Sequence, residues 1–289
     1  MYESRGGQRS PLLVLGTMGS MPARLDGSEK QVRLVIEYDG TRYAGWQVQP
    51  NGIAVQQVVE EALLSLLGHS VRLVSSGRTD AGVHAFGMVA CFRTSRGLPE
   101  QAFRDGLNRY LPEDVVIRQA NIVPLDFHPR FDSQGKWYRY TLNLSPVRTA
   151  INRHACWTIK KPLDLQAMEK AASFLVGRHD FTAFRASNCS AKTTVREIFS
   201  IDIVQDGPLL YLDVRGGGFL KFMVRIIVGT LVEVGLGKRP SENVPLLLKH
   251  GSRVNAGKTA PPHGLCLMEV WYGDQTPCTV PLKNNLPKV

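Results

Sequence analysis

The chain has 289 residues, enough for one large domain or two smaller ones. With 43% hydrophobic and 21% charged residues, its composition is that of an ordinary globular protein. Lysine and arginine total 35 against 25 acidic residues, and the resulting net charge of +10 is spread along the chain and not collected in a tail. This balance favours a folded basic surface that faces a polyanion, most often nucleic acid.

The cysteines and the apolar segments argue against several other classes of protein. The five cysteines lie far apart and contain no Cys-x-x-Cys pair, which disfavours a zinc site of the usual spacing and a disulfide framework and indicates a reducing cytosol. The longest apolar segment, residues 219–234, contains Lys221, Arg225 and Glu233, so it does not read as a membrane span. The apolar run at residues 11–16 is too short for a signal peptide. We therefore expect a cytoplasmic protein.

The first half of the chain begins with residues 1–30, which lack periodicity and are rich in Gly, Ser and Arg, so we expect a disordered leader. From Gln31, apolar and polar residues alternate, which predicts a strand that ends at the turn signal Asp39-Gly40. The following segments predict a helix over 55–67 closed by Gly68, strands over 71–74 and 86–92, a helix from Pro99 to Leu111 and a strand over 115–123. This strand-helix-strand-strand-helix-strand order is that of the ferredoxin-like or split βαβ unit.

The sequence of the second half indicates the same strand-helix-strand-strand-helix-strand order once its insertions are removed. Its predicted elements are a strand over 136–144, a short strand over 154–159, a helix over 165–175, a hairpin of strands 195–204 and 209–215, an apolar helix opened by Gly216–Gly218, a short helix over 241–249 and a strand over 265–272. We therefore predict an α+β protein with two ferredoxin-like halves, residues 31–130 and 131–273, each with an antiparallel sheet. Residues 274–289 are expected to form a flexible tail.

The loop over residues 75–85, between two predicted strands, holds the strongest candidate for chemistry. Asp80 is its only acidic residue, it lies between two glycines, and Arg78 precedes it by two positions. A nearby guanidinium keeps a carboxylate ionised, and an ionised, positioned carboxylate can act as a nucleophile or a proton acceptor. The alternative is that Asp80 only caps a turn. A metal site built from Asp80 and His84 is disfavoured, because two ligands at this spacing have no further acidic or histidine cluster to complete them.

Two residues of the second half are candidates for the same site. Tyr138 lies in a strand among basic and aromatic residues, so its ring either fills the core or stacks on a base lifted out of an RNA helix. Arg225 lies in an apolar helix, where a cation either extends to solvent or needs a buried partner, and Asp80 is the natural candidate. Gly216–Gly218 could present backbone N–H groups to a phosphate, but a tight strand-to-helix turn is the simpler interpretation. The residues alone do not indicate the reaction.

Seven blocks in the chain resemble the TruA family of tRNA pseudouridine synthases, and they occur in the order typical of that family. They are Tyr38–Thr41, Gly45–Asn51, Gly77–Ala85, His128–Phe131, Tyr138–Tyr140, Phe219–Gly229 and Thr259–Leu265. The resemblance implies isomerisation of uridine to pseudouridine at positions 38, 39 and 40 of the tRNA anticodon stem-loop, without metal or other cofactor. It also implies a homodimer that binds tRNA in basic clefts.

The resemblance assigns roles to four residues. Asp80 corresponds to the catalytic aspartate, and Tyr138 to the tyrosine that stacks on the target uracil and helps to remove the C5 proton. Arg225 corresponds to the partner of the aspartate, and Arg78 to an arginine that takes part in opening the RNA. We therefore expect an active-site cleft between the halves, with Asp80 on one wall and Tyr138 and Arg225 on the other. Neither half should then be active alone.

Two alternative functions remain open from the sequence. A non-catalytic RNA-binding protein of two RRM-like folds would carry an aromatic-basic signature on its central strands, and we find no such block. A tRNA chaperone that is also catalytically competent cannot be separated from an enzyme by sequence.

Overall fold

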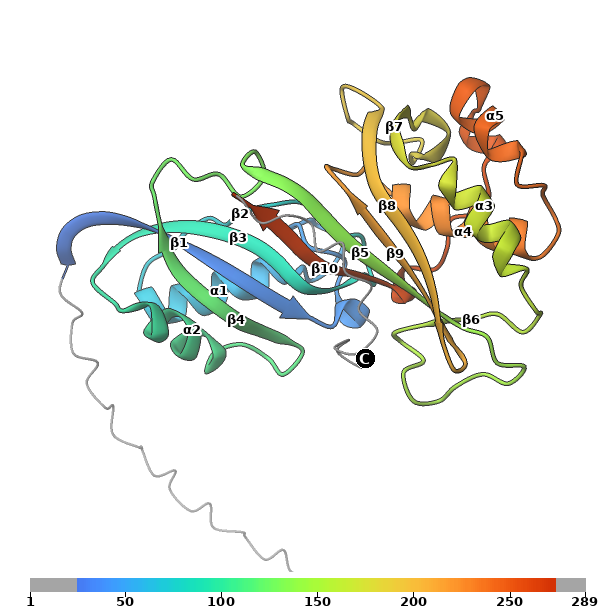
Figure 1. Ribbon diagram of the computed structural model, residues 1–289. Helices are drawn as coiled ribbons and strands as arrows, with labels where there is room; N and C mark the ends of the chain where they lie inside the picture. Colours follow the sequence, from blue (N-terminus) through green and yellow to red (C-terminus); the bar gives the residue numbers. More distant parts are fainter. Residues whose placement is uncertain (1–24, 274–289) are drawn as a thin grey trace, which may run out of the picture.

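Ten strands form one continuous mixed sheet along the length of the molecule in the computed structural model, which describes residues 25–273 (Figure 1). The strands are β1 (Leu25–Tyr38), β2 (Val74–Ser75), β3 (His84–Arg96), β4 (Val115–Val123), β5 (Ser133–Asn143), β6 (Trp157–Thr158), β7 (Gly177–Asp180), β8 (Val195–Asp206), β9 (Leu209–Gly216) and β10 (Leu265–Tyr272). The helices are α1 (Val55–Leu67), α2 (Glu100–Asn108), α3 (Leu165–Ser173), α4 (Met223–Gly235) and α5 (Asn243–His250). The predictions for residues 1–24 and 274–289 lie outside the described residues.

The strand order of the sheet is β4-β1-β3-β10-β5-β9-β8-β7, with β2 paired to β3 and β6 paired to β5. Each half uses the same arrangement, in which its fourth, first, third and second main strands lie side by side: β4-β1-β3-β2 and β10-β5-β9-β8. Within each of these groups the pairs are antiparallel. The prediction of separate antiparallel sheets needs correction, because β10 also pairs in parallel with β3 and joins the two.

One hydrophobic core runs through both halves on the helix-covered face of the sheet. In β1, Val32, Leu34 and Ile36 are completely buried and alternate with less buried residues, as the predicted period of two requires. In β5, Tyr138 and Tyr140 belong to this core, whereas Trp137 belongs to a small second cluster with Met268 and Trp271. Since neighbouring strand residues point to opposite faces, this second cluster lies on the other face of the sheet.

Several element boundaries differ from the sequence prediction. The strand expected from Gln31 begins at Leu25. The apolar helix begins at Met223, not directly after Gly216–Gly218, because Phe222 adopts the left-handed conformation (φ 64) and breaks the helical path. The edge strand β7 was not predicted, since its polar sequence Gly-Arg-His-Asp shows no apolar alternation. By contrast, β4 and β10 have the predicted bounds.

None of the helices within residues 25–273 is long and apolar enough to cross a membrane.

In α4, the close approach of Gly229 to the backbone of Lys258 predicts that alanine at position 229 destabilises the protein, the reverse of its usual effect in a helix. Alanine normally stabilises a helix relative to glycine by about 1 kcal/mol. At Gly229, however, an added methyl group would overlap the carbonyl oxygen of Lys258. We therefore expect Gly229→Ala to lower the free energy of unfolding by about 2 kcal/mol, measured by urea denaturation. Gly218→Ala is the control, because nothing lies within 4 Å of its added methyl group. A Gly229→Ala protein as stable as the control would contradict this packing.

Candidate active site

The loop that carries Asp80 spans Ser76–Val83 and is held by its own flanking segments. The backbone N–H of Trp46 donates to the Thr79 carbonyl oxygen at 3.1 Å, and the Tyr38 and Thr79 hydroxyl groups lie 2.7 Å apart. Gly45 has φ +107, and a side chain there would approach the Thr79 oxygen to 2.7 Å, so only glycine permits this contact. Residues 43–46 therefore fix the backbone on either side of Asp80.

Arg225 of α4 lies beside Asp80. Its Nη1 is 3.2 Å from Asp80 Oδ2, although 145 residues separate the two in sequence. The side chains are 11% and 23% exposed, so the pair is largely shielded from water. Arg225 Nε also donates to the Ala260 carbonyl oxygen at 2.8 Å, which fixes the guanidinium. The carboxylate of the first half thus meets a positioned cation of the second half.

Burial and charge act in opposite directions on Asp80. Burial raises its pKa above the ordinary aspartate value, whereas the charges of Arg225 and then of Lys221 oppose this rise. Without Arg225 the charged form would be strongly disfavoured at this position. The cation therefore keeps a partly buried carboxylate available as a negatively charged, poorly hydrated group, which is the state a nucleophile needs.

Arg78 does not neutralise Asp80 in this structure. It is exposed, and among the described residues no hydrogen bond or ion pair joins it to Asp80. Between the two, Thr79 is buried against Tyr38, so the successive side chains of the loop point in different directions. The guanidinium expected beside the carboxylate is that of Arg225, and Arg78 is left free to meet a ligand from solvent.

Tyr138 lies in β5 and is only 9% exposed. Its ring meets Phe219 edge-on, with centroids 5.2 Å apart at 85°. Burial, and next the charge of Asp80, raise the pKa of Tyr138 well above that of a free tyrosine. The phenol therefore keeps its proton at neutral pH. In this state the side chain can act as a stacking ring or a hydrogen-bond donor.

Lys136, to which the sequence analysis assigned no role of its own, contacts the Asp80 loop. It lies two positions before Tyr138, so both side chains project from the same face of β5. Its Nζ donates to the Ser76 carbonyl oxygen at 2.7 Å, at the beginning of the Asp80 loop. Burial and the charge of Arg130 lower the pKa of Lys136 to about 8. Its position on the Tyr138 face was the one signal that could have found it.

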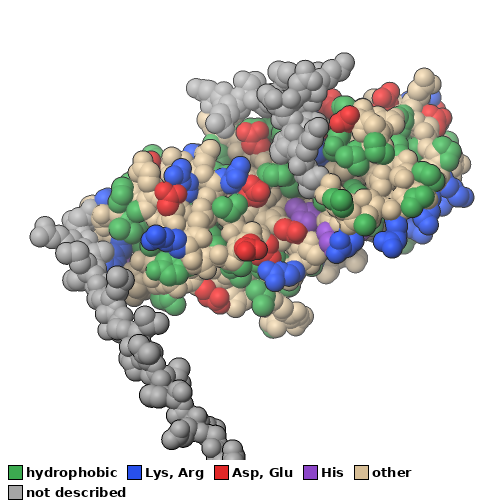
Figure 2. Space-filling view, turned by 90° about the horizontal axis from the view of Figure 1, so that it is seen from below, with side chains coloured by type: hydrophobic (Ala, Val, Ile, Leu, Met, Phe, Trp, Pro, Cys, Tyr) green, Lys and Arg blue, Asp and Glu red, His purple; other side chains and the backbone are tan. Residues whose placement is uncertain are grey.

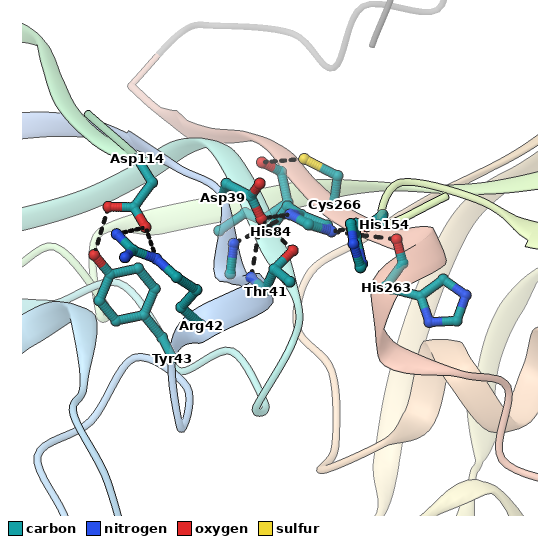
Figure 3. Close-up of polar contacts among 11 residues, drawn as sticks. Asp39, Thr41, Arg42, Tyr43, His84, Asp114, His154, His263 and Cys266 are labelled. Carbon is teal, nitrogen blue, oxygen red and sulfur yellow. Dashed lines mark hydrogen bonds and ion pairs between the residues drawn. The ribbon is translucent and has the colours of Figure 1, made fainter. Parts of the chain in front are cut away.

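His84 joins three segments at the end of the Asp80 loop (Figure 3). Its Nδ1 accepts a hydrogen bond from the backbone N–H of Gly40 at 3.1 Å. Nε2 lies 2.7 Å from the His154 carbonyl oxygen and 3.2 Å from that of His263. Residues 154 and 263 belong to the second half, so His84 connects the two halves close to the short β3–β10 pairing.

The acidic neighbour of His84 is Asp39, at 3.1 Å, and not Asp80 (Figure 3). Within residues 25–273 no group of three or more His, Cys, Asp or Glu side chains could hold a metal ion. A second network in Figure 3 ties the neighbouring loop to the beginning of β4, where Arg42 and Tyr43 both bind the Asp114 carboxylate at 2.7 Å. These contacts indicate a structural role for His84.

Comparison with known proteins identifies the family. A family model described as tRNA pseudouridine synthase matches residues 34–132 and 171–273. The chain is 59% identical over 244 residues to "tRNA pseudouridine synthase A" of Geobacter sp. (strain M21), covering 84% of this chain and 99% of that protein. Proteins of the same name from Syntrophotalea carbinolica and Myxococcus xanthus are 60% and 50% identical, covering 84% and 87% of this chain and 97% and 95% of those proteins. The chain belongs to the tRNA pseudouridine synthase family.

Lys136 predicts a pH dependence of stability. Its pKa is about 8 in the folded protein against 10.5 for an ordinary lysine, so between these values the folded state binds fewer protons than the unfolded state. The contribution of Lys136 to the free energy of unfolding therefore rises as the pH rises from about 8 towards 10.5, and is constant below pH 8.

The measurement is urea unfolding of the wild type and Lys136→Met at several pH values between 7 and 10. The difference in stability between wild type and variant should increase in favour of the wild type above pH 8. Lys161→Met, at an exposed position, should show no such trend. A difference that stays flat would mean that the pKa of Lys136 is that of an ordinary lysine, and one that falls with pH would mean that folding raises this pKa.

Proposed function

We propose that the protein is an isomerase that converts uridine to pseudouridine in tRNA, with Asp80 as the catalytic aspartate. The observation that carries this proposal is the shielded Asp80–Arg225 pair next to Tyr138, in a chain of the tRNA pseudouridine synthase family. A carboxylate, a fixed cation and an aromatic ring are the groups needed to break and remake a bond at the sugar of a stacked base.

The reaction rearranges bonds within one nucleotide. The carboxylate of Asp80 bonds to the ribose C1′ as the bond between C1′ and uracil N1 breaks, and the base then turns. C5 bonds to C1′ as the Asp80–C1′ bond breaks. The C5 proton passes to solvent water, and N1 takes up a proton from solvent. We propose that Asp80 supplies the nucleophilic carboxylate and that Arg225 holds it in place. Tyr138 stacks on the uracil after the nucleotide has left its helix. Arg78, exposed at the loop tip, helps to open the RNA.

The target and the assembly are part of the proposal. We propose positions 38, 39 and 40 of the anticodon stem-loop as substrates and a homodimer as the binding unit. The net charge of +10 supports a polyanionic partner. Figure 2 shows Lys and Arg side chains gathered along the edge of the second half. The cysteines at 91, 156, 189 and 266 are all free thiols, which supports a cytoplasmic location.

We also propose that the two halves are ferredoxin-like units, residues 31–130 and 131–273. Support comes from the shared element order and from the shared fourth-first-third-second strand arrangement. The connection between β4 and β5 falls at the proposed boundary. Since Asp80 lies in one unit and Arg225 and Tyr138 in the other, the site requires both.

Asp80→Asn tests the proposed chemistry. The variant keeps the size of the side chain but removes its negative charge, so the rate of pseudouridine formation in a tRNA transcript should fall by about 1,000-fold or more, while tRNA binding persists. Product is measured by mass spectrometry of nuclease digests. Asp105→Asn, an exposed residue paired with Arg104 on α2, should retain full activity. Pseudouridine formation at the wild-type rate by Asp80→Asn would show that Asp80 is not the catalytic group.

A further inference from the structure

The turn over residues 128–132 presents an aromatic ring to solvent. Phe131 is 75% exposed. The other exposed phenylalanine and tyrosine residues among residues 28–273 are less exposed, Tyr110 at 54% and Phe199 at 38%. An apolar ring of this size is normally buried, because exposure forfeits its hydrophobic stabilisation. An exposed ring of this kind is therefore a candidate contact for a binding partner.

The turn is held rigidly by its own hydrogen bonds. His128 Nδ1 accepts from the backbone N–H groups of Arg130 and Phe131, at 3.1 and 3.3 Å. The Asp132 carboxylate accepts from the His128 N–H at 2.8 Å, and the Asp132 N–H donates to the His128 carbonyl oxygen at 3.1 Å. These hydrogen bonds fix the backbone of the turn on both sides of Phe131.

The ring environment is that of a stacking platform. The His128 ring lies against Phe131, with centroids 4.2 Å apart at 36°. The Arg130 guanidinium carbon is 5.9 Å from the Phe131 centroid and the side chain is exposed. The phenyl ring thus has an aromatic neighbour, and the Arg130 guanidinium lies over the ring, which is still 75% exposed.

Lys136 and Tyr272 connect the 128–132 turn to the rest of the fold. Tyr272, at the end of β10, donates to the Pro129 carbonyl oxygen at 2.6 Å and so anchors the turn to the sheet. Lys136 contacts Ser76 at the beginning of the loop, and its ammonium group interacts with the charge of Arg130. Lys136 therefore lies between Arg130 and the beginning of the loop that carries Asp80.

We propose that Phe131, supported by His128, is a stacking site for an unpaired base of the RNA substrate, and that Arg130 meets the neighbouring phosphate. This inference rests on the proposed function. Every nucleobase has a flat π face, and a ring that is already fixed loses little conformational entropy on stacking. The net positive charge of the protein complements the phosphates that accompany such a base. The site would hold RNA without touching the reacting atoms.

The experiment measures the affinity of full-length protein for a fluorescently labelled tRNA transcript in the Asp80→Asn background, so that no turnover occurs. Phe131→Ala should weaken binding by about 5-fold to 100-fold, and Phe131→Trp should restore it, because tryptophan also stacks. Phe131→Leu should bind as weakly as Phe131→Ala. Tyr110→Ala, which removes another exposed aromatic side chain, should bind as tightly as the parent.

Salt dependence separates stacking from charge effects. Phe131→Ala should leave the slope of log Kd against log salt concentration unchanged, whereas Arg130→Ala should reduce it by about 1. Unchanged affinity of Phe131→Ala would overturn the proposal, as would full affinity of Phe131→Leu. So would a changed mass of Phe131→Ala in analytical ultracentrifugation, which would assign the ring to contact between two copies of the chain. Failure of the proposed function would appear separately, as absence of pseudouridine formation by the wild type.

Discussion

The site depends on one interaction, the ion pair between Asp80 and Arg225. A carboxylate that is largely shielded from water is unfavourable unless a cation compensates it, and burial alone would drive Asp80 towards its protonated form. Arg225 supplies that cation from a helix of the other half, 145 residues away. The state of this carboxylate therefore depends on both halves of the fold, since no side chain of the loop itself, which lies within the described residues, forms a hydrogen bond or ion pair with the Asp80 carboxylate.

The surrounding structure holds Asp80 and Arg225 in position relative to each other. The short parallel pairing of β3 with β10 joins the two halves into one sheet, and His84 binds backbone groups of both halves next to it. On one side, Gly45 allows residues 43–46 to press against the Asp80 loop. On the other, Ala260 binds both the backbone and the guanidinium of Arg225. Small displacements of either half would change the Asp80–Arg225 distance directly.

Local patterns were sufficient to predict most of the helices and strands. Each of these elements has one buried face, and its apolar residues recur along the sequence with the period of that face. For this reason β4 and β10 have the predicted bounds, and Gly68 ends α1 as expected. Asp80, Tyr138 and Arg225 could likewise be selected as candidates. Long-range features could not be obtained in this way. The joining of the sheets through β3 and β10, the left-handed Phe222 and the outward direction of Arg78 all depend on contacts between distant segments.

A double-mutant cycle on the free energy of unfolding tests the central claim most directly. The four proteins are the wild type, Asp80→Asn, Arg225→Met and the double variant, unfolded by urea at pH 8. If Arg225 compensates the shielded charge of Asp80, Arg225→Met should destabilise the wild type more than it destabilises the Asp80→Asn protein, with a coupling energy of about 1–2 kcal/mol. Equal effects of Arg225→Met in both backgrounds, and thus no coupling, would contradict the account.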